Sequence, residues 1–464
     1  MERWMLSDIA RLFGQGVPDG IAVCSICTDS RAITAGCLFV ALEGERFDGH
    51  NFVREAFEKG AVAAICRKEV PDCAHPIIYV KDTQRALITL GCAYRLKYDM
   101  PVVAVTGSVG KTTTKDMVAC AMGAHCKTLK TEGNHNNEIG LPLTLLQLDR
   151  TYGCAVIEMG MTHMGDLSLL SAATLPDVAI ITNIGVSHIE SLGSRENILK
   201  AKLEIAEGLP TGGTLILNYD DDLLCDIKSD RGFVIMAYGI DNPASDVVAK
   251  GIRREGEETL FTIRYQDKDY PARIPCIGRH NVLNALAAFC AAAALGLDLE
   301  KSVAALARFT PSGMRQRLVR RDGVTVIEDC YNASPDSMKA ALGTLRTLTQ
   351  EGKEGRSIAV LADMLELGGY SQTAHEAVGR MVRETGTDIL IACGVEAAYI
   401  AQSAKAAGVE QVYYFDDKTG AGNKLARLAR EGDTILFKGS RGMRLEEIIE
   451  CFYAQLGKDE KVLR

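Results

Sequence analysis

Short apolar runs alternate with amphipathic segments along most of the chain, a pattern typical of parallel sheets covered by helices. In the first hundred residues, the apolar runs predict strands at 37–42, 61–66 and 77–80. Apolar residues at helical spacing predict helices at 51–59 and 83–97 among them. This part of the chain is therefore expected to form a small α/β N-terminal domain.

The same alternation continues after Pro101 and becomes more regular. Strands are expected at 102–105, 154–158, 178–182, 214–218 and 233–238, with helical patterns between most of them. This order predicts a mostly parallel sheet with helices on its faces. Residues 246–276 differ, because alternating charged residues and turns predict an antiparallel appendage there. A helical run at 280–295 ends this section.

A turn-like sequence at 310–313 opens the last section. Five strands that alternate with helical patterns are expected there, at 324–329, 357–361, 389–392, 411–415 and 434–437. This alternation predicts a doubly wound, Rossmann-like domain. Because 464 residues exceed what one core usually holds, we expect three α/β domains, at 1–100, 101–309 and 310–464.

The composition is that of a globular protein, with 47% hydrophobic and 24% charged residues. The net charge of −8 argues against a broad nucleic-acid or membrane surface, but it allows a local site for an anionic substrate. The longest apolar stretch, 285–297, is shorter than the ~20 residues of a membrane-spanning helix. The first residues include acidic side chains and no uninterrupted apolar segment, so we expect no secretion signal. We expect a cytoplasmic protein and a monomer.

The 15 cysteines are scattered and odd in number, so they cannot all pair within one chain. Without an export signal, they are expected to be reduced and mostly buried. Cys24 and Cys27 form a C-x-x-C motif, which raises the alternative of a zinc or redox site. No second Cys or His pair lies at suitable spacing, so a structural role is favoured for this pair.

The strand at 102–105 leads into a glycine-containing loop and then into a helical segment. The loop has the sequence Thr106-Gly107-Ser108-Val109-Gly110-Lys111-Thr112-Thr113. Its glycines allow backbone N–H groups to surround phosphate oxygens, and the helix N-terminus adds the positive end of its dipole. Lys111 is expected to reach the terminal phosphates of a nucleotide, and Thr112 to bind Mg²⁺. Val105 stands where the general phosphate-loop pattern has glycine, so an ordinary strand-to-helix turn stays the alternative.

Further polar side chains lie close to the ends of expected strands. Glu158 ends a strand beside the loop, where a nucleotide-bound Mg²⁺ finds protein oxygen, and we expect Glu158 and Lys111 to line a solvated cleft. Loop 131–140 is crowded with amide side chains, which suit an amide-rich ligand or, equally, a hydrogen-bonded turn. His188 follows the strand at 178–182 near the expected metal, and its alternative is a structural histidine.

Taken together, these stretches resemble the Mur ligase family over nearly the whole chain. The segments that carry the resemblance are 28–31, 38–42 and 44–50 in the first section, 106–113, 133–137, 157–160, His188, 199–205 and 278–285 in the second, and 328–338, 361–368 and 438–444 in the third. Val105 is the form that the phosphate loop takes in this family. The segments of the third section are similar to the dipeptide-adding branch, except that Ser334 stands where Asn is usual. The Asp-Asn-Pro-Arg segment of the diaminopimelate-adding relative does not occur.

The resemblance implies an ATP-dependent ligase that adds D-alanyl-D-alanine to UDP-N-acetylmuramoyl-tripeptide through an acyl phosphate, with Mg²⁺ required. It also implies that the first section holds the uridine diphosphate end, that the second is the ATPase core, and that the partners are small molecules alone. Two alternative interpretations remain. The first is another ligase of this architecture, such as a different Mur enzyme or a folylpolyglutamate synthase. The second is a phosphate-loop GTPase or regulatory module, although the guanine-reading Asn-Lys-x-Asp segment is absent.

The resemblance also assigns roles to individual residues. The implied ATP-binding residues are Gly107, Ser108, Val109, Gly110, Lys111, Thr112, Thr113, Asn281 (adenine), Arg315 (phosphates) and Asp329 (ribose side). The implied substrate-binding residues are Ser30, Arg46, Asn134, Asn136, Asn137 and Asn332. The implied catalytic residues are Lys111, Glu158, His188 and Lys202, and the implied metal contacts are Thr112, Glu158, His188 and Lys202. Lys202 is expected to carry a carbamate, and Lys200 to lie on a different face of the same helix.

Overall fold

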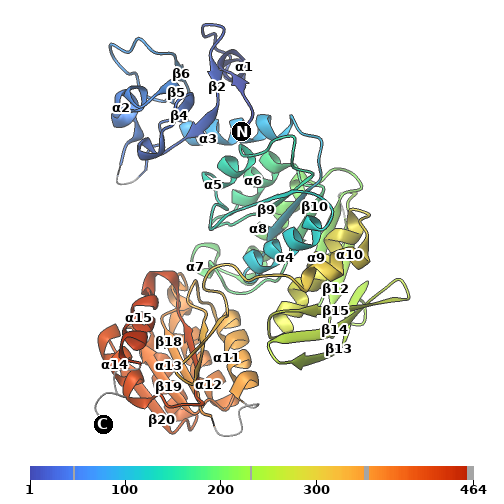
Figure 1. Cartoon of the computed structure of the whole chain (residues 1–464), viewed down its shortest axis with the longest axis vertical. Helices are drawn as coiled ribbons and strands as arrows, with labels where there is room; N and C mark the ends of the chain where they lie inside the picture. The colour runs from blue at the N-terminus through green and yellow to red at the C-terminus, as the bar shows by residue number, and fades with distance from the viewer. Residues whose placement is uncertain (45–46, 230–231, 350–354, 457–464) are drawn as a thin grey trace.

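The computed structural model describes residues 1–44, 47–229, 232–349 and 355–456. Three α/β domains follow one another in chain order along the longest axis of the molecule, with the N-terminal domain at one end and the C-terminal domain at the other (Figure 1). The expected fold class is thereby confirmed. Within the described residues, no helix has both the length and the apolar character that crossing a bilayer requires.

The N-terminal domain is built on a four-stranded parallel sheet in the order β3-β4-β5-β6. Its elements are β3 (Ser25–Cys27), β4 (Cys37–Val40), β5 (Ala61–Cys66), β6 (Ile77–Tyr79), α1 (Leu6–Arg11), α2 (Val53–Glu58) and α3 (Thr83–Arg95), with an antiparallel pair of β1 (Trp4–Met5) and β2 (Ala22–Val23). All four residues of β4 are buried, as expected of a parallel strand that is covered on both faces. The strands and helices expected here are confirmed.

The middle domain contains a nine-stranded sheet in the order β15-β14-β13-β12-β11-β10-β7-β9-β8. The strands are β7 (Val102–Thr106), β8 (Thr128–Lys130), β9 (Cys154–Glu158), β10 (Val178–Ile181), β11 (Thr214–Asn218), β12 (Val234–Gly239), β13 (Val247–Glu255), β14 (Glu258–Tyr265) and β15 (Lys268–Ile274). The expected appendage is antiparallel, as β13–β15. It is not a separate sheet, because β13 pairs in parallel with β12 and so extends the main sheet.

Successive residues of β7 point to opposite faces of this sheet and join two cores. The helices of the domain are α4 (Lys111–Gly123), α5 (Gly140–Leu145), α6 (Asp166–Thr174), α7 (Ile189–Leu192), α8 (Arg195–Leu203), α9 (Arg279–Ala294) and α10 (Leu299–Leu306). Val102 and Ala104 face the core that includes residues of α5, α6 and α8. Val103 and Val105 face the core that includes residues of α4, α9 and α10. The carboxyl end of β7 therefore opens at the middle of the sheet, where α/β proteins commonly bind ligands.

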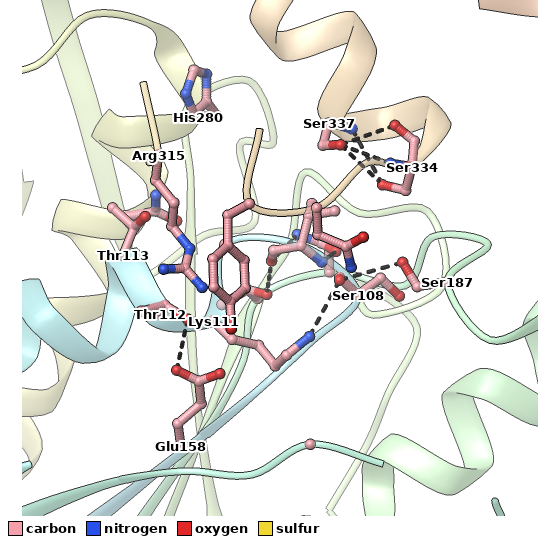
Figure 2. Close-up of a pocket in the computed structure, with 18 of the residues that line it drawn as sticks. Ser108, Lys111, Thr112, Thr113, Glu158, Ser187, His280, Arg315, Ser334 and Ser337 are labelled. Carbon is pink, nitrogen blue, oxygen red and sulfur yellow. Dashed lines mark hydrogen bonds between the residues drawn. The ribbon is translucent and has the colours of Figure 1, made fainter. Parts of the chain in front are cut away.

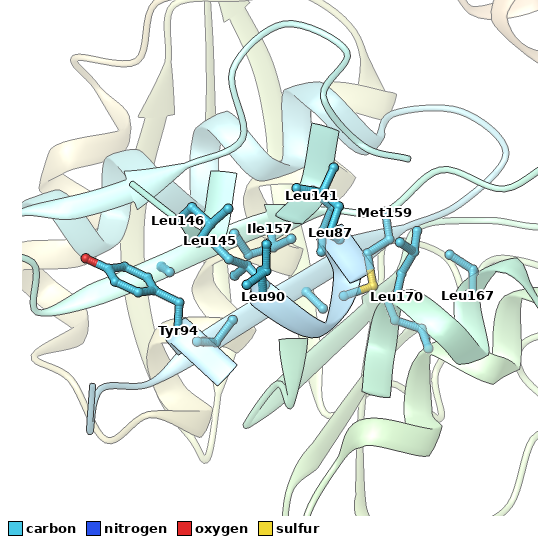
Figure 3. Close-up of a cluster of buried hydrophobic side chains, with 14 of the residues drawn as sticks. Leu87, Leu90, Tyr94, Leu141, Leu145, Leu146, Ile157, Met159, Leu167 and Leu170 are labelled. Carbon is cyan, nitrogen blue, oxygen red and sulfur yellow. The ribbon is translucent and has the colours of Figure 1, made fainter. Parts of the chain in front are cut away.

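Helix α3 joins the N-terminal domain to the middle domain through a shared apolar core. The contact is made by Leu87, Leu90 and Tyr94 of α3 and by Leu141, Leu145 and Leu146 in and after α5 (Figure 3). A Cβ atom on Gly91 would lie only 2.9 Å from the Cα atom of Pro142, so the two helices approach closely. Tyr94 Oη also donates to the carbonyl oxygen of Leu148 at 3.1 Å. Through α3, the N-terminal domain thus packs against the middle domain.

The C-terminal domain has a six-stranded sheet in the order β16-β17-β21-β18-β19-β20. Its elements are β16 (Arg317–Arg321), β17 (Val324–Glu328), β18 (Ser357–Ala362), β19 (Ile389–Cys393), β20 (Gln411–Phe415), β21 (Thr434–Lys438), α11 (Pro335–Thr349), α12 (Ser371–Glu384), α13 (Ala397–Ala406), α14 (Lys418–Leu428) and α15 (Glu446–Gln455). The five expected strands are present and parallel. β16 was not expected, because its charged residues hide the strand pattern, and it pairs antiparallel with β17 at the edge.

Candidate active site

A cavity of about 720 Å³ lies where the middle and C-terminal domains meet. Its lining comes from the loop between β7 and α4, the loop after β8, the end of β9, the start of α9 and the segments that flank β16 and β17 (Figure 2). None of the described residues before Ser108 lines it. The residues expected to bind ATP, apart from Gly107, and most of those expected to bind the peptide substrate therefore share one space.

The loop between β7 and α4 is fixed by the segment that follows β10. Gly107 has a φ of 152°, and a Cβ atom there would lie 1.8 Å from Oγ1 of Thr182. Thr182 Oγ1 and Asn183 Nδ2 donate to the carbonyl oxygen of Val109 at 2.6 and 2.9 Å. The Val109 N–H in turn donates to Asn183 Oδ1 at 3.0 Å. Gly110, with a φ of 83°, then begins α4. The loop is held in one shape with the N-terminus of α4 at its end, an arrangement that favours anion binding.

Lys111 is the first residue of α4, and its side chain folds back over the loop. Its amine donates to the carbonyl oxygens of Gly107 at 2.7 Å and Ser108 at 3.3 Å (Figure 2). Burial lowers the pKa of Lys111, and the negative charge of Glu158 opposes this change. Among the described residues, the amine bonds only to these neutral carbonyl groups. An anion in the loop would therefore offer it a stronger, charge-assisted acceptor.

Glu158 ends β9 and lines the cavity beside Lys111. Thr112 Oγ1 donates to its Oε2 at 2.8 Å, and Asn136 Nδ2 donates to its Oε1 at 2.8 Å. The residue is only 2% exposed. The sequence predicted a solvated position for Glu158, and this was wrong, because two neighbouring polar side chains replace water around the carboxylate. A hydroxyl group and a carboxylate that lie side by side at a phosphate loop are a donor set suited to Mg²⁺.

The C-terminal domain contributes an aromatic ring and a buried ion pair to the cavity. The Arg315 guanidinium lies 3.8 Å from the centre of the Tyr331 ring. Lys438 Nζ lies 2.8 Å from Oδ2 of Asp329 and also donates to the carbonyl oxygen of Asn332 at 3.2 Å. Tyr331 and Lys438 were not predicted as site residues. Both follow or end strands of the C-terminal sheet, the position from which α/β proteins present ligand-binding groups, and that signal could have found them.

Polar residues of α9 form the opposite wall. Asn281 Nδ2 donates to the carbonyl oxygen of Ile277 at 2.8 Å and to Oε1 of Gln316 at 3.2 Å. Asn284, one turn further along, accepts a hydrogen bond from Thr114 Oγ1 at 3.0 Å. Asn284 was not predicted, although its spacing from Asn281 places both on one helix face.

His188 lies at the start of α7, with a φ of 64°, and reaches across to the C-terminal domain. Its Nδ1 lies 3.1 Å from Oε2 of Glu366, which also lines the cavity. This hydrogen bond holds the pKa of Glu366 below its usual value. Glu366 was not assigned a role from the sequence, because no local pattern marks a contact between two domains.

The comparisons with known proteins agree with this geometry. Residues 23–95, 105–292 and 314–441 match the catalytic domain of the Mur ligase family, the Mur ligase middle domain and the glutamate ligase domain of Mur ligases, respectively. The chain is 42% identical over 429 residues to the UDP-N-acetylmuramoyl-tripeptide--D-alanyl-D-alanine ligase of Bacillus subtilis, with 92% of each chain covered. The chain belongs to the Mur ligase family.

Two solved structures extend the comparison. MurF from Acinetobacter baumannii has a TM-score of 0.90 with 32% identity, and covers 98% of this chain and 99% of its own. MurF from Thermotoga maritima in complex with ADP has a TM-score of 0.85 with 29% identity, and covers 94% and 98%. As a Mur ligase of this type, the chain is an ATP-dependent, amide-bond-forming enzyme.

Lys202 of this Mur ligase lies on α8 and is 1% exposed, whereas Lys200 is exposed. The two lysines thus lie on different faces of α8, as predicted. Burial lowers the pKa of Lys202 well below its usual value, and the positive charge of Lys111 adds to this effect. No ion-pair partner of the Lys202 amine is found in the part of the chain that the structure describes, so the neutral amine is favoured.

The remaining predicted residues are distributed unevenly. Asn134, Asn136 and Asn137 line the cavity of the Mur ligase, and Asn137 Oδ1 also accepts the backbone N–H of Gly140 at 2.9 Å. Ser30 lies in the N-terminal domain away from the cavity, and Arg46 lies outside the described residues. The described residues contain no cluster of three or more His, Cys, Asp or Glu side chains suited to a metal ion.

Proposed function

We propose that the chain joins D-alanyl-D-alanine to UDP-N-acetylmuramoyl-tripeptide with hydrolysis of ATP to ADP and phosphate, the activity named for its Bacillus subtilis relative. One observation carries the proposal beyond the family. The phosphate loop around Lys111 opens into the same cavity as Asn332 and Glu366 of the C-terminal domain. A nucleotide and two further reactants can therefore meet without leaving the protein.

The chemistry follows from the reactants. A peptide carboxylate does not react with amines at neutral pH, and phosphorylation converts it to an acyl phosphate with a good leaving group. The neutral amine nitrogen of the dipeptide then attacks the acyl carbon, phosphate departs with the electrons of the C–O bond, and the nitrogen loses one proton to solvent. Lys111 and Arg315 supply positive charge for the phosphoryl group, and the shared cavity holds the reactants in position.

Thr112 and Glu158 would hold a Mg²⁺ ion, which would neutralise phosphate charge when bound. His188 is proposed as a further contact, and its Nδ1 also bonds to Glu366. Lys202 is proposed to carry a carbamate, formed when its neutral amine attacks CO₂ and releases a proton. The burial of Lys202 supports this proposal, because a cationic lysine cannot react in this way.

We further propose that each of the three domains binds the ligands that the sequence suggested for it. Residues 1–100 would hold the uridine diphosphate end through Ser30 and Arg46, and residues 101–309 would form the ATPase core. Residues 310–464 would bind the dipeptide and contribute to ATP binding through Arg315 and Asp329. The separation of the N-terminal sheet from the cavity supports this division. A long, nucleotide-linked substrate can be held at one end there while its other end enters the cavity.

Mass spectrometry of a complete reaction tests the proposal. Purified protein with ATP, Mg²⁺, UDP-N-acetylmuramoyl-tripeptide and D-alanyl-D-alanine is expected to give the pentapeptide, ADP and phosphate in equal amounts. Parallel reactions with lysine- and diaminopimelate-containing tripeptides identify the preferred form. Rapid nucleotide hydrolysis that needs neither peptide substrate would favour the regulatory-module interpretation and contradict the proposal.

A further inference from the structure

Glu366 is held in an unusual backbone conformation at the edge of the cavity. Its φ is 63°, in the left-handed region that glutamate rarely adopts. The residues before it are fixed by two buried side chains: Met364 N–H donates to His375 Nε2 at 3.0 Å, and Leu365 N–H donates to Ser440 Oγ at 2.9 Å. A strained residue that its surroundings hold in place is a frequent mark of a functional site.

The carboxylate of Glu366 is more accessible to a ligand than the carboxylate of Asp329. The C-terminal domain contributes two carboxylates to the cavity, Asp329 and Glu366. Asp329 forms an ion pair with Lys438, which is buried. Among the described residues, Glu366 pairs with His188 alone, and its side chain is 65% exposed. Its carboxylate therefore keeps oxygen lone pairs for a ligand in the cavity that it lines.

The dipeptide substrate needs a negatively charged group close to its amine. The amino group of a dipeptide is largely protonated at neutral pH, since α-amino groups have a pKa of roughly 7.7–8.0. It must approach Lys111 of the phosphate loop and Arg315 of the C-terminal domain, and the positive charges of these two side chains would repel it. Glu366 lies close enough to Lys111 for the two charges to influence one another. A carboxylate at this position offsets the repulsion where the amine has to arrive.

We propose that Glu366 binds the ammonium group of the incoming dipeptide and places its nitrogen beside the activated carboxyl group. The ammonium group then releases one proton to solvent before the nitrogen attacks, because only the neutral amine has a lone pair. The assignment rests on the proposed function and adds Glu366 to it, as the negatively charged residue that binds the amine of the dipeptide. His188 comes from the middle domain, so its hydrogen bond orients the carboxylate only when the two domains are together. The amine site is thus complete only when the phosphate loop is next to it.

The isosteric variant Glu366→Gln tests the assignment. The KM for D-alanyl-D-alanine is expected to rise about tenfold or more, as for loss of a charged hydrogen bond, while the KM values for ATP and the nucleotide-linked tripeptide stay unchanged. Hydroxylamine provides a second measurement, because it is uncharged at mildly alkaline pH and captures acyl phosphates as hydroxamates. Hydroxamate formation from ATP and the tripeptide is expected to persist in Glu366→Gln.

Two further variants separate binding from a structural effect. Glu190→Gln removes a carboxylate from the same domain interface, next to Gly368 but outside the cavity, and is expected to leave all three KM values unchanged. Glu366→Asp keeps the charge and is expected to restore part of the dipeptide affinity.

Several outcomes would overturn the assignment. These are an unchanged KM for the dipeptide in Glu366→Gln, an equal rise in all three KM values, or a higher Mg²⁺ requirement. A dipeptide defect in Glu138→Gln alone would transfer the role to Glu138, which also lines the cavity. Failure of the wild-type enzyme to form both the hydroxamate and the pentapeptide would instead contradict the proposed function itself.

Discussion

The hydroxyl group of Thr112 lies 2.8 Å from Oε2 of Glu158, and this hydrogen bond joins the first turn of α4 to the end of β9. Asn136 holds the other carboxylate oxygen from a third segment. Glu158 is therefore a packing contact as well as a candidate metal contact, and its replacement is expected to affect stability and turnover together.

Glu158→Ala is expected to lower kcat by about 10²-fold or more, because it removes charge that is needed while the phosphoryl group moves. The free energy of unfolding is expected to fall by roughly 1–3 kcal/mol, because Thr112 and Asn136 lose a buried acceptor. Coupled phosphate release and urea unfolding measure the two effects. Glu158→Gln, which keeps one oxygen acceptor, should recover stability more than turnover. Wild-type turnover in Glu158→Ala would contradict the assignment.

Lys111→Ala is expected to give a similar loss in kcat, about 10²-fold or more, with little change in unfolding. Within the part of the chain that the structure describes, the lysine amine bonds only to two carbonyl groups of its own loop. Steady-state kinetics and thermal unfolding provide the test. Lys127→Ala, which removes a surface lysine that bonds to Thr151, is the matched control and should behave as wild type. If the two variants were equally active, the phosphate-binding role of the loop would be wrong.

Lys202→Ala is expected to lose most activity, and added formate or acetate should restore part of it by supplying a carboxylate at the vacated position. Lys200→Ala is the natural control, because Lys200 lies on the same helix but is exposed. Mass spectrometry of the native protein should show an added CO₂ at Lys202 that is lost in acid. Full activity in Lys202→Ala would end the proposal of a carbamate.

Binding of an ATP analogue together with the nucleotide-linked tripeptide is expected to decrease the radius of gyration. The cavity lies between the middle and C-terminal domains, and residues 310–313 connect them without helix or strand. Ser312 Oγ lies 2.5 Å from Oδ2 of Asp116 on α4, so the connection is attached at one point. Small-angle scattering with and without both ligands provides the measurement. An unchanged radius at saturation would argue against closure.

The sequence predicted the positions of the main strands along the chain, because each strand is a compact apolar run between turn residues. It missed β16 because an edge strand that faces solvent carries charged residues such as Arg317 and Arg320, which do not differ in pattern from a loop. The short strand β8 was missed for a related reason, since three residues give too little periodicity.

The phosphate loop was predictable because its function depends on residues that are adjacent in the chain. The contacts between Glu158 and Asn136 and between His188 and Glu366 were not, because they depend on how separate segments and domains pack. The burial of Lys202 followed from family resemblance and not from helical pattern, since the polar positions of α8 give no clear apolar face.

If the N-terminal sheet holds the uridine diphosphate end as proposed, the close packing of α3 on α5, with Gly91 against Pro142, would give the enzyme a means to measure length. A substrate held at that sheet and at the phosphate loop would have to span the distance between them. One residue changes the reach of an extended peptide by about 3.5 Å. A nucleotide-linked dipeptide would therefore leave its terminal carboxyl group short of Lys111, and a tetrapeptide would carry it too far. Selection of the correct intermediate by size would then be a property of a helix that lines no part of the cavity.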